Sequence, residues 1–472
     1  MSFSSINFLF ILLPVTLVLY YLVRSWKWRN LVLLAASLLF FAWGDFGHVP
    51  LLVGLVLLNY GIARWIGAYA ARNQPKAAQR VMWLGVGLNI LILWFSKYLG
   101  FSVGIFQQIT GTQFEFIEPK RPLGISYFTF SSLSYLLDVY YGVEKAERNL
   151  LRFGNYIVMF PKLLQGPITR FGQVKAELQT AAFNYEEILD GVRRFIVGLA
   201  KKVIIADTIA AATKKILAVD MATIGADVAW FAVIAFTLQI YFDFSGYTDM
   251  AVGLGKMLGF RLPENFNYPY ISRSITEFWR RWHMTLTAWF RTYLFIPLEF
   301  ARKNVKHLRQ QTNLFIVFLL TGLWHDASWN FIIWGGYFGI ILVIEASGWG
   351  RKLKTLPRVL QHLYALLLIM VGWIFFRLIN PADWGPFFGA LVGAHGWSGV
   401  SNFRTLNIVF YVPLMIAAGF LSLPWLKQKV DALVERSTVG SILVDGLLLC
   451  LFALTVAYVL SNGYAAFMYG SF

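Results

Sequence analysis

Long apolar stretches recur along almost the whole of this chain. A transmembrane helix needs about 20 consecutive, mostly apolar residues. Stretches that reach or approach this length lie around residues 7–23, 31–46, 49–68, 82–104, 122–141, 225–242, 312–347 (two helices), 359–377, 405–425 and 439–461. Two shorter or interrupted segments, 154–169 and 244–262, are candidate re-entrant segments. Irregular backbone is tolerated at membrane depth where protein or a watery cavity surrounds it. We therefore predict an all-α polytopic membrane protein with about 10–12 membrane-spanning or re-entrant helices.

The composition excludes the other broad classes of protein. Hydrophobic residues make up 58% of the 472 residues and charged residues 14%, and the mean hydropathy is +0.60. A soluble domain carries about 25% charged residues, and a disordered chain is poor in aliphatic and aromatic residues. The one cysteine, Cys450, also excludes an internal disulfide and a cysteine-based metal site.

The placement of the basic residues predicts an orientation in the membrane. Cytoplasmic loops of membrane proteins carry an excess of Lys and Arg. Such residues follow the first span (Arg24, Lys27, Arg29), the third span (Arg72, Lys76, Arg80) and the fifth span (Lys145, Arg148, Arg152), and they recur at Lys352, Lys354, Arg358, Lys427 and Lys429. The intervening loops 105–121 and 378–403 are poor in net positive charge. We therefore expect a periplasmic amino terminus, and we attribute the net charge of +17 to the membrane rather than to a nucleic acid partner.

No internal repeat and no polar linker divides the chain, so we expect one integral-membrane domain over residues 1–472. Within it we distinguish N-terminal spans (1–110), a motif-bearing core (120–350) and C-terminal spans (355–472). Region 170–310 is rich in basic residues interleaved with apolar ones, and 272–296 carries an apolar stripe at helical spacing. This pattern predicts amphipathic helices on the cytoplasmic face. Attraction to anionic lipids explains most of these basic residues, and a docking face for the phosphates of a cytosolic cofactor is the sharper alternative.

Polar residues inside apolar segments are the first functional candidates. A charge at the bilayer centre costs about 2.5–3.5 kcal/mol on insertion scales. The densest cluster, QIYFDFSGYTDMAVGLG at 239–255, contains Asp243 and Asp249. These carboxylates either fix neighbouring helices through buried hydrogen bonds or take part directly in catalysis, and the sequence alone leaves both interpretations open.

Two of the six histidines stand apart from the other four. His325 lies in the apolar segment FLLTGLWHDASWNFIIWGG, where small neighbours such as Gly322 suggest room for a ligand. His283 lies at the border of the apolar stripe, in EFWRRWHMTLTAWF. An imidazole can take and return a proton near neutral pH. The alternatives are a core histidine bonded to a carbonyl at His325 and an interfacial histidine at His283.

Several familiar catalytic patterns are missing from the sequence. There is no His-Glu-X-X-His motif and no other paired-histidine spacing on one helix, so we expect no metal. Gly-X-Ser-X-Gly and a Walker loop are also absent, which disfavours a serine nucleophile elbow and an ATPase.

Four longer stretches carry a family resemblance. They are PLGISYFTFSSLSYLLDVYYG (122–142), YFDFSGYTDMAVGLGKMLGF (241–260), PENFNYPYISRSITEFWRRWH (263–283) and GLWHDASWNFIIWG (322–335). Through them the chain resembles the membrane-bound O-acyltransferase family, in particular its bacterial alginate O-acetyltransferase type. The chain departs from the family pattern at Asp326, where the family usually has glycine, and at 299–302, where a Gly-Gly-Asn-Arg turn is usual.

The resemblance implies a ring of membrane helices around a central tunnel, with His325 and His283 as the catalytic pair. It also implies transfer of an acetyl group from a cytosolic thioester, acetyl-CoA or another phosphopantetheine thioester, with no permanently bound cofactor. The acetyl group is then passed across the inner membrane to periplasmic or membrane-anchored partner proteins, which place it on an exported polysaccharide such as alginate or cellulose within an exopolysaccharide synthesis complex. We expect supporting roles for Asp243, Asp249, Arg280, Arg281, Trp324 and Asn330. A transporter or flippase for a lipid-linked sugar or acyl group, and a structural scaffold, are the alternatives.

Overall fold

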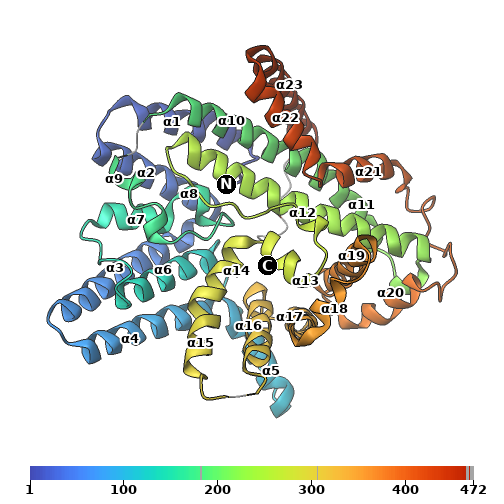
Figure 1. The fold of residues 1–472 in the computed structure, drawn as a ribbon, viewed down its shortest axis with the longest axis horizontal. Helices are drawn as coiled ribbons and strands as arrows, with labels where there is room; N and C mark the ends of the chain where they lie inside the picture. Colours follow the sequence, from blue (N-terminus) through green and yellow to red (C-terminus); the bar gives the residue numbers. More distant parts are fainter. Residues whose placement is uncertain (181–182, 306, 464–466, 468–472) are drawn as a thin grey trace. The chain divides into compact units, whose positions relative to one another are not determined.

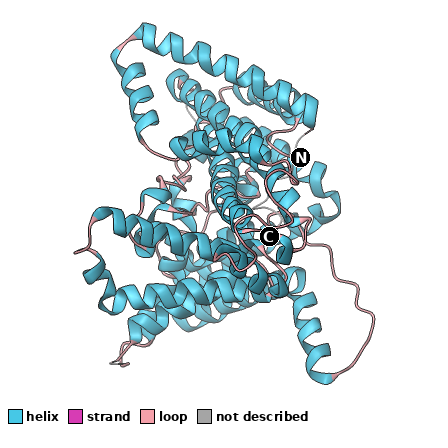
Figure 2. Cartoon of the chain, turned by 90° about the vertical axis from the view of Figure 1, so that its right-hand side faces the viewer, coloured by secondary structure: helices cyan, strands magenta, loops and turns pink. Residues whose placement is uncertain are grey.

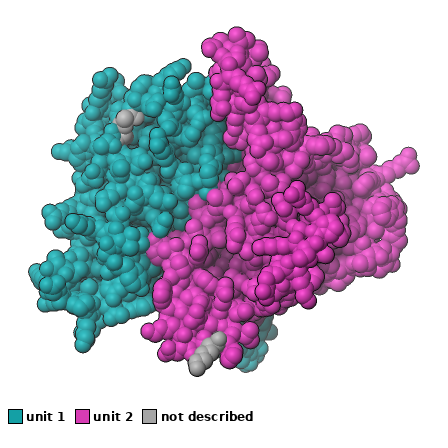
Figure 3. Space-filling view, in the orientation of Figure 1, with its two compact units in different colours: residues 1–195, 248–264 teal, residues 196–247, 265–472 magenta. Residues whose placement is uncertain are grey.

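The computed structural model describes residues 1–180, 183–305, 307–463 and 467. Within these residues the chain consists of helices and loops, as Figures 1 and 2 show, with one isolated β-bridge between Ile224 and Ser401. The chain divides into two compact units, drawn in different colours in Figure 3: residues 1–195 with 248–264, and residues 196–247 with 265–472. The predicted all-α class is confirmed.

The first unit is built from the N-terminal helices. These are α1 (Leu13–Leu22), α2 (Trp26–Asp45), α3 (Val49–Ala71), α4 (Pro75–Leu93), α5 (Leu99–Thr110), α6 (Ile125–Tyr140), α7 (Leu150–Val158), α8 (Phe160–Leu163), α9 (Glu177–Thr180) and most of α10 (Tyr185–Ala200). Helix α3 packs against α4 and α6, and α2 packs against α7. Helix starts follow local chemistry: α3 and α4 carry proline in their first turn, and the Asn149 side chain accepts from the Arg152 backbone N–H at the start of α7.

Segment 154–169 does not form a long helix. Helices α7 and α8 are short and buried, and they meet at Met159, whose ψ of 115° breaks the helical path. Helix α6, by contrast, is continuous and almost entirely buried on all sides. The short helices therefore lie within protein, which is the condition for irregular backbone in a membrane protein.

The second unit contains the later helices. These are α11 (Asp207–Leu217), most of α12 (Ala226–Met257), α13 (Ile275–Arg281), α14 (Met284–Phe290), α15 (Ile296–Ala301), α16 (Arg309–His325), α17 (Trp329–Ile344), α18 (Gly350–Leu353), α19 (Arg358–Arg377), α20 (Trp384–Leu391), α21 (Val412–Leu421), α22 (Trp425–Arg436) and α23 (Thr438–Asn462). The closest helix pair of the unit is α16 and α17.

Helix α12 corrects one sequence prediction. Segments 225–242 and 244–262 were expected to be a span and a separate interrupted segment, but residues 226–257 form one continuous helix. The glycines of this helix serve packing. A Cβ at Gly246 would lie 2.8 Å from the carbonyl oxygen of Gly198, so the missing side chain lets another helix approach the backbone of α12.

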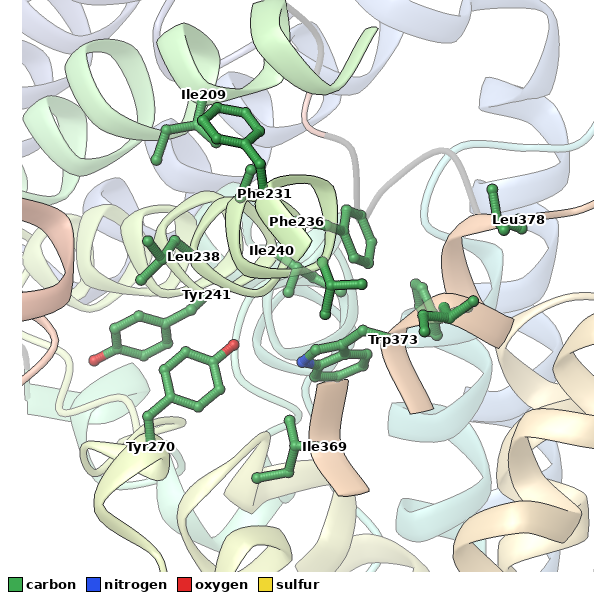
Figure 4. Packing of buried hydrophobic residues seen from close by; sticks show 14 of the residues in the cluster. Ile209, Phe231, Phe236, Leu238, Ile240, Tyr241, Tyr270, Ile369, Trp373 and Leu378 are labelled. Atoms are coloured by element: carbon green, nitrogen blue, oxygen red, sulfur yellow. The ribbon is translucent and has the colours of Figure 1, made fainter. Parts of the chain in front are cut away.

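A large aromatic cluster forms the core of the second unit. Trp282, Trp334 and Trp373 are among the largest fully buried side chains, and the Trp282 and Trp373 ring centroids lie 5.0 Å apart. Figure 4 shows Trp373 near Tyr270, whose hydroxyl donates to the backbone oxygen of Thr237 in α12. Such aromatic pairs stabilise by about 0.5–1.5 kcal/mol each beyond their buried area. The core therefore holds α12, α13, α17 and α19 together.

Six helical stretches among the described residues are long and apolar enough to cross a membrane. They are Trp26–Ala71, Pro75–Thr110, Ala226–Met257, Trp329–Leu353, Arg358–Arg377 and Thr438–Ser461, and a seventh is obtained if the pair Val409–Leu421 and Trp425–Arg436, bent by 62°, is one span. Other predicted segments fall on shorter helices, such as Phe8–Leu22. Many leucine, isoleucine and valine side chains on these helices are exposed, as expected for surfaces that face lipid.

Candidate active site

Helices α16 and α17 form a tight hairpin that carries His325. A Cβ at Gly322 would lie 2.2 Å from the Phe331 carbonyl oxygen, and a Cβ at Gly335 would lie 2.5 Å from that of Phe318. Only glycine permits this approach of two backbones. The expectation that small neighbours of His325 leave room for a ligand is therefore wrong for Gly322, because the facing helix fills that space.

His325 is the last residue of α16 and is 4% exposed. Its ring is enclosed by other rings: Trp324 at a centroid distance of 5.0 Å, Trp334 at 5.0 Å and Phe376 at 5.4 Å. The next residue, Asp326, leaves the helix in an extended conformation, with φ of −158°, and its side chain accepts from the Ala327 backbone N–H. This backbone does not require glycine, which explains how the chain accommodates its departure from the family pattern.

His283 lies at a break between two short helices. Stripe 272–296 does not form one helix, since α13 ends at Arg281 and His283 adopts a left-handed φ of 44° before α14 begins. A left-handed conformation is uncommon for a residue other than glycine and is typical of functional or strained positions. The break turns His283 inward, and it is 1% exposed.

The start of α13 is anchored from a distant part of the chain. The buried carboxylate of Glu345 accepts from the backbone N–H groups of Ile275 at 2.8 Å and of Thr276 at 2.9 Å. The Thr276 hydroxyl donates to the same carboxylate. A carboxylate at a helix N-terminus satisfies otherwise unpaired donors and suits the helix dipole. Glu345 therefore holds the short helix that leads into His283.

The Asn265 side chain contacts the imidazole of His283. Its Oδ1 lies 3.0 Å from His283 Nδ1. The same oxygen accepts from the Thr285 backbone N–H at 3.2 Å and from the Thr285 hydroxyl at 2.9 Å. A backbone N–H is always a donor, so the Asn265 atom is an acceptor, and His283 Nδ1 must carry the proton. Nε2 of the neutral ring is then a hydrogen-bond acceptor.

Electrostatics favour the neutral form of His283. Burial lowers the pKa of His283 from 6.5 to about 3. The ring packs edge-on against Phe244, with a centroid distance of 4.8 Å. Asn265 Nδ2 is buried and makes no hydrogen bond with the described part of the chain. The site therefore combines an imidazole that is neutral at physiological pH with an amide donor on the same neighbour.

The Trp324 ring lies next to both histidine rings. It lies 6.3 Å from the His283 ring and 5.0 Å from the His325 ring, and the Trp324 side chain is 6% exposed. Two imidazoles from different helices thus adjoin one indole in an otherwise apolar environment. Such a site can position a hydroxyl and manage one proton, which is the requirement of acyl transfer from an activated ester.

The other predicted residues of the second unit have identifiable contacts. Asn330, in the first turn of α17, accepts from the Ser328 hydroxyl at 2.6 Å and donates to the Phe375 carbonyl oxygen at 3.4 Å. Arg281 pairs with Glu277 at 3.0 Å. Arg280 is exposed. Asn330 therefore lies beside Phe331 in the aromatic wall of His325, while the two arginines lie at the surface end of α13.

The predicted carboxylates are both in ion pairs. In the second unit Asp243 accepts from Lys202 Nζ at 2.8 Å, and the same ammonium donates to Asp207 at 2.6 Å. In the first unit Asp249 accepts from Arg194 at 2.9 Å. Lys202 and Asp243 are almost completely buried. These contacts favour the interpretation in which the carboxylates fix helices.

Segment 299–302 replaces the usual family turn with a polar network. Glu299 accepts from Arg309 at 2.9 Å and from the Asn313 side chain at 2.6 Å. Arg302 donates to Asn313 at 2.5 Å. An ion pair with two side-chain hydrogen bonds thus holds the end of α15 near the start of α16.

Asn265, Lys202 and Glu345 were not identified from the sequence. Asn265 lies in a stretch that resembles the family, but an asparagine among Pro, Phe and Tyr gives no periodic signal. Lys202 lies in the basic region, where lipid attraction explains most charges. No group of three or more His, Cys, Asp or Glu side chains within the described ranges could hold a metal ion.

The fold and the site define a multi-pass membrane protein with a buried pair of imidazoles. The sequence model of the MBOAT, membrane-bound O-acyltransferase family, matches residues 143–376, which include His283 and His325. The chain is 38% identical to the probable alginate O-acetylase AlgI of Pseudomonas putida over 100% of both chains. It is 43% identical to the probable alginate O-acetylase AlgI of Pseudomonas aeruginosa, over 80% of this chain and 72% of the relative.

The name of another relative gives a different acceptor. The chain is 35% identical to the peptidoglycan O-acetyltransferase of Helicobacter pylori, over 84% of this chain and 80% of the relative. The chain therefore belongs to the membrane-bound O-acyltransferase family, and it is an O-acyltransferase. The predicted resemblance is confirmed.

Proposed function

We propose that this protein takes an acetyl group from a cytosolic thioester and delivers it across the inner membrane for O-acetylation of an exported polysaccharide. The names of the relatives, which act on alginate and peptidoglycan, support this class of acceptor. The observation that carries the proposal is the pair of buried imidazoles that both lie next to the Trp324 ring. Residues that match the family model supply both rings.

In the proposed reaction His325 is the general base. It removes the proton from the acceptor hydroxyl as that oxygen attacks the thioester carbonyl carbon. The new C–O bond forms, the C–S bond breaks, and the proton passes to the departing sulfur. General base catalysis contributes about 10²–10⁴ in rate, and alignment of both reactants contributes about 7–11 kcal/mol.

His283 has a complementary role. Its Nδ1 donates to Asn265, so its Nε2 is an acceptor and can orient the substrate through a donor group other than the hydroxyl that His325 deprotonates. A donor to the developing oxyanion must come from another group, and Asn265 Nδ2 has the right chemistry. Trp324 and Asn330 hold the surrounding walls.

The donor, the route and the partners complete the proposal. Acetyl-CoA or another phosphopantetheine thioester is the donor substrate, and no cofactor is permanently bound. The acetyl group passes through a central tunnel to periplasmic or membrane-anchored acetyltransferase partners of an exopolysaccharide synthesis complex. The basic inner loops give the orientation, with the amino terminus in the periplasm. The acceptor polymer is alginate, cellulose, another exopolysaccharide or peptidoglycan.

The test uses purified protein in membrane-mimetic discs with radiolabelled acetyl-CoA and an acetyl carrier protein, in parallel. His325→Ala should abolish acetyl transfer and the accompanying release of thiol. His307→Ala, which changes an exposed histidine, is the matched control and should retain activity. Near-normal transfer by His325→Ala would reject the assignment. Substrate transport without any thiol release by the unmodified protein would favour the transporter.

A further inference from the structure

The second unit contains an apolar cavity on the side of α19 that carries Arg377. Helices α11, α12, α19 and α20 line it, with Ile216, Phe236, Trp373 and Phe387 among the lining residues. Its volume is about 30 Å³, enough for roughly two groups of the size of water or a methylene. Figure 4 shows Phe236 from α12 and Trp373 from α19 close together, with Leu378 beside them.

Among the described residues that line this cavity, Arg377 is the only charged one. Its guanidinium carbon lies 5.7 Å from the centre of the Phe236 ring. Its Nε is buried and has no hydrogen-bond partner in the described part of the chain. Two other partly buried arginines, Arg281 and Arg309, pair with the carboxylates of Glu277 and Glu299. Arg377 forms no ion pair with any described residue.

Besides Arg377, the described lining contains the Thr213 hydroxyl and the buried indole N–H of Trp373, which has no hydrogen-bond partner among the described residues. The Thr213 hydroxyl donates to Gln239 Oε1 at 2.8 Å and contacts the backbone oxygen of Ala210 at 3.0 Å. The cavity therefore presents one cation at its edge and mainly carbon elsewhere. A ligand that fits must be anionic at one end and apolar at the other.

The position of Arg377 along α19 indicates what kind of amphiphile this is. Arg358–Arg377 is one of the apolar helices long enough to cross the membrane, and Arg377 is its last residue. A long basic side chain at the end of a span lies at the level of the lipid headgroups. Met370, Trp373 and Ile374 lie on the preceding two turns, which extend about 10 Å into the apolar part of the helix.

We propose that this cavity is a binding site for an anionic phospholipid. The phosphate contacts the guanidinium of Arg377, which offers it two parallel N–H donors. The first methylenes of one acyl chain enter the space between Phe236, Trp373 and Ile374. The remainder of the chain follows α19 along the bilayer.

Lipid retention tests this proposal without reference to acyl transfer. The full-length protein is equilibrated in detergent with equal amounts of phosphatidylglycerol and phosphatidylcholine of identical chains, and retained lipids are counted by native mass spectrometry. We expect preferential retention of phosphatidylglycerol. Arg377→Gln should lower it about fivefold, the factor that one basic side chain near anionic lipid contributes. Arg404→Gln, which changes an exposed arginine, should leave it unchanged.

A second variant separates the cavity from the charge. Ala232→Leu adds methyl groups to the cavity wall and leaves Arg377 in place. It should lower the retention of both lipids at the site. Equal retention of the two lipids by the unmodified protein, an unchanged preference in Arg377→Gln, or full retention in Ala232→Leu would each overturn the proposal. Arg377→Lys, which keeps the charge, replaces the glutamine variant if that variant does not fold.

Discussion

Asn265→Asp provides the sharpest test of the proposed chemistry of His283. The substitution keeps the size and shape of the side chain and turns the amide oxygen that contacts Nδ1 into part of a carboxylate. The donors that now reach this oxygen, His283 Nδ1 at 3.0 Å and the two Thr285 groups at 3.2 and 2.9 Å, would stabilise a negative charge there. The carboxylate should therefore ionise and pair with the imidazolium.

The magnitude follows from the geometry. Two unit charges about 4 Å apart interact by about 4 kcal/mol at an effective dielectric constant of 20, which corresponds to about three pKa units. An opposite charge at this range raises a histidine pKa by about 1–3 units. Burial holds the pKa of His283 at about 3. The pKa of His283 in Asn265→Asp should thus lie roughly between 4 and 6.

Selective ¹⁵N labelling of histidine and NMR titration measure both the tautomer and the pKa. The unmodified protein should show His283 as the Nδ1–H form down to low pH, and Asn265→Asp should shift its titration upward. Asn380→Asp is the control, because Asn380 is an exposed helix cap that contacts no histidine. An Nε2–H tautomer in the unmodified protein, or an unmoved midpoint in Asn265→Asp, would refute the argument.

The stability of the protein in acid follows from the same pKa. Because the folded pKa of His283 lies below the unfolded value, the unfolded chain binds more protons between about pH 6.5 and 3. The free energy of unfolding should therefore fall by up to about 1.4 kcal/mol per pH unit as the pH decreases through this window. In Asn265→Asp this loss should be smaller, and thermal unfolding in detergent at stepped pH measures the difference.

Two further predictions concern buried lysines. Lys202→Met removes the cation shared by the Asp243 and Asp207 carboxylates and should lower the free energy of unfolding by about 3–5 kcal/mol, with part of the loss recovered in the double variant that adds Asp243→Asn. Equal losses in both variants would contradict the pairing. Among the described residues, the Lys162 amine contacts only the Ser131 hydroxyl at 3.4 Å and the Tyr156 ring at 4.4 Å. Burial lowers the pKa of Lys162 from 10.5 to about 7. Lys162→Met should raise the free energy of unfolding by up to about 5 kcal/mol at pH 7, and this gain should shrink as the pH rises toward 10. A loss of stability would instead show that the amine has a partner that compensates its burial.

Hydropathy and periodicity predicted the class of the fold but not where its helices continue or break. The apolar stretches at 122–141 and 312–347 correspond to α6 and to the pair α16 and α17. Segment 244–262 was expected to be separate from the preceding span. Its glycines do not decide the question, since a glycine that permits close packing and a glycine that interrupts a helix look the same in one sequence. The deciding fact is the backbone on the facing helix, such as Gly198 opposite Gly246.

The two histidines could be chosen from the sequence because a polar imidazole in an apolar segment costs free energy unless it has a function or a partner. Their environment could not be predicted in the same way. The apolar stripe around His283 suggested one helix. In the structure, Glu345 caps α13 from 70 residues away, and the left-handed conformation of His283 separates α13 from α14. Contacts of this kind depend on pairs of residues that are distant in the chain. For the same reason Asn265 became a candidate only when its contact with His283 was visible.

In the second unit the buried charges and the imidazoles have different surroundings, and this contrast bears on catalysis. The ammonium of Lys202 lies between two carboxylates, and Glu345 receives three donors from α13. The first charge lies beside opposite charges, and the second has hydrogen-bond donors that compensate its burial. His325 is instead surrounded by aromatic rings, and His283 contacts a neutral amide. A carboxylate in place of the Asn265 amide would favour the imidazolium of His283, which cannot accept a hydrogen bond. The neutral amide keeps the His283 ring an acceptor, and the apolar walls strengthen the hydrogen bonds that orient the reactants.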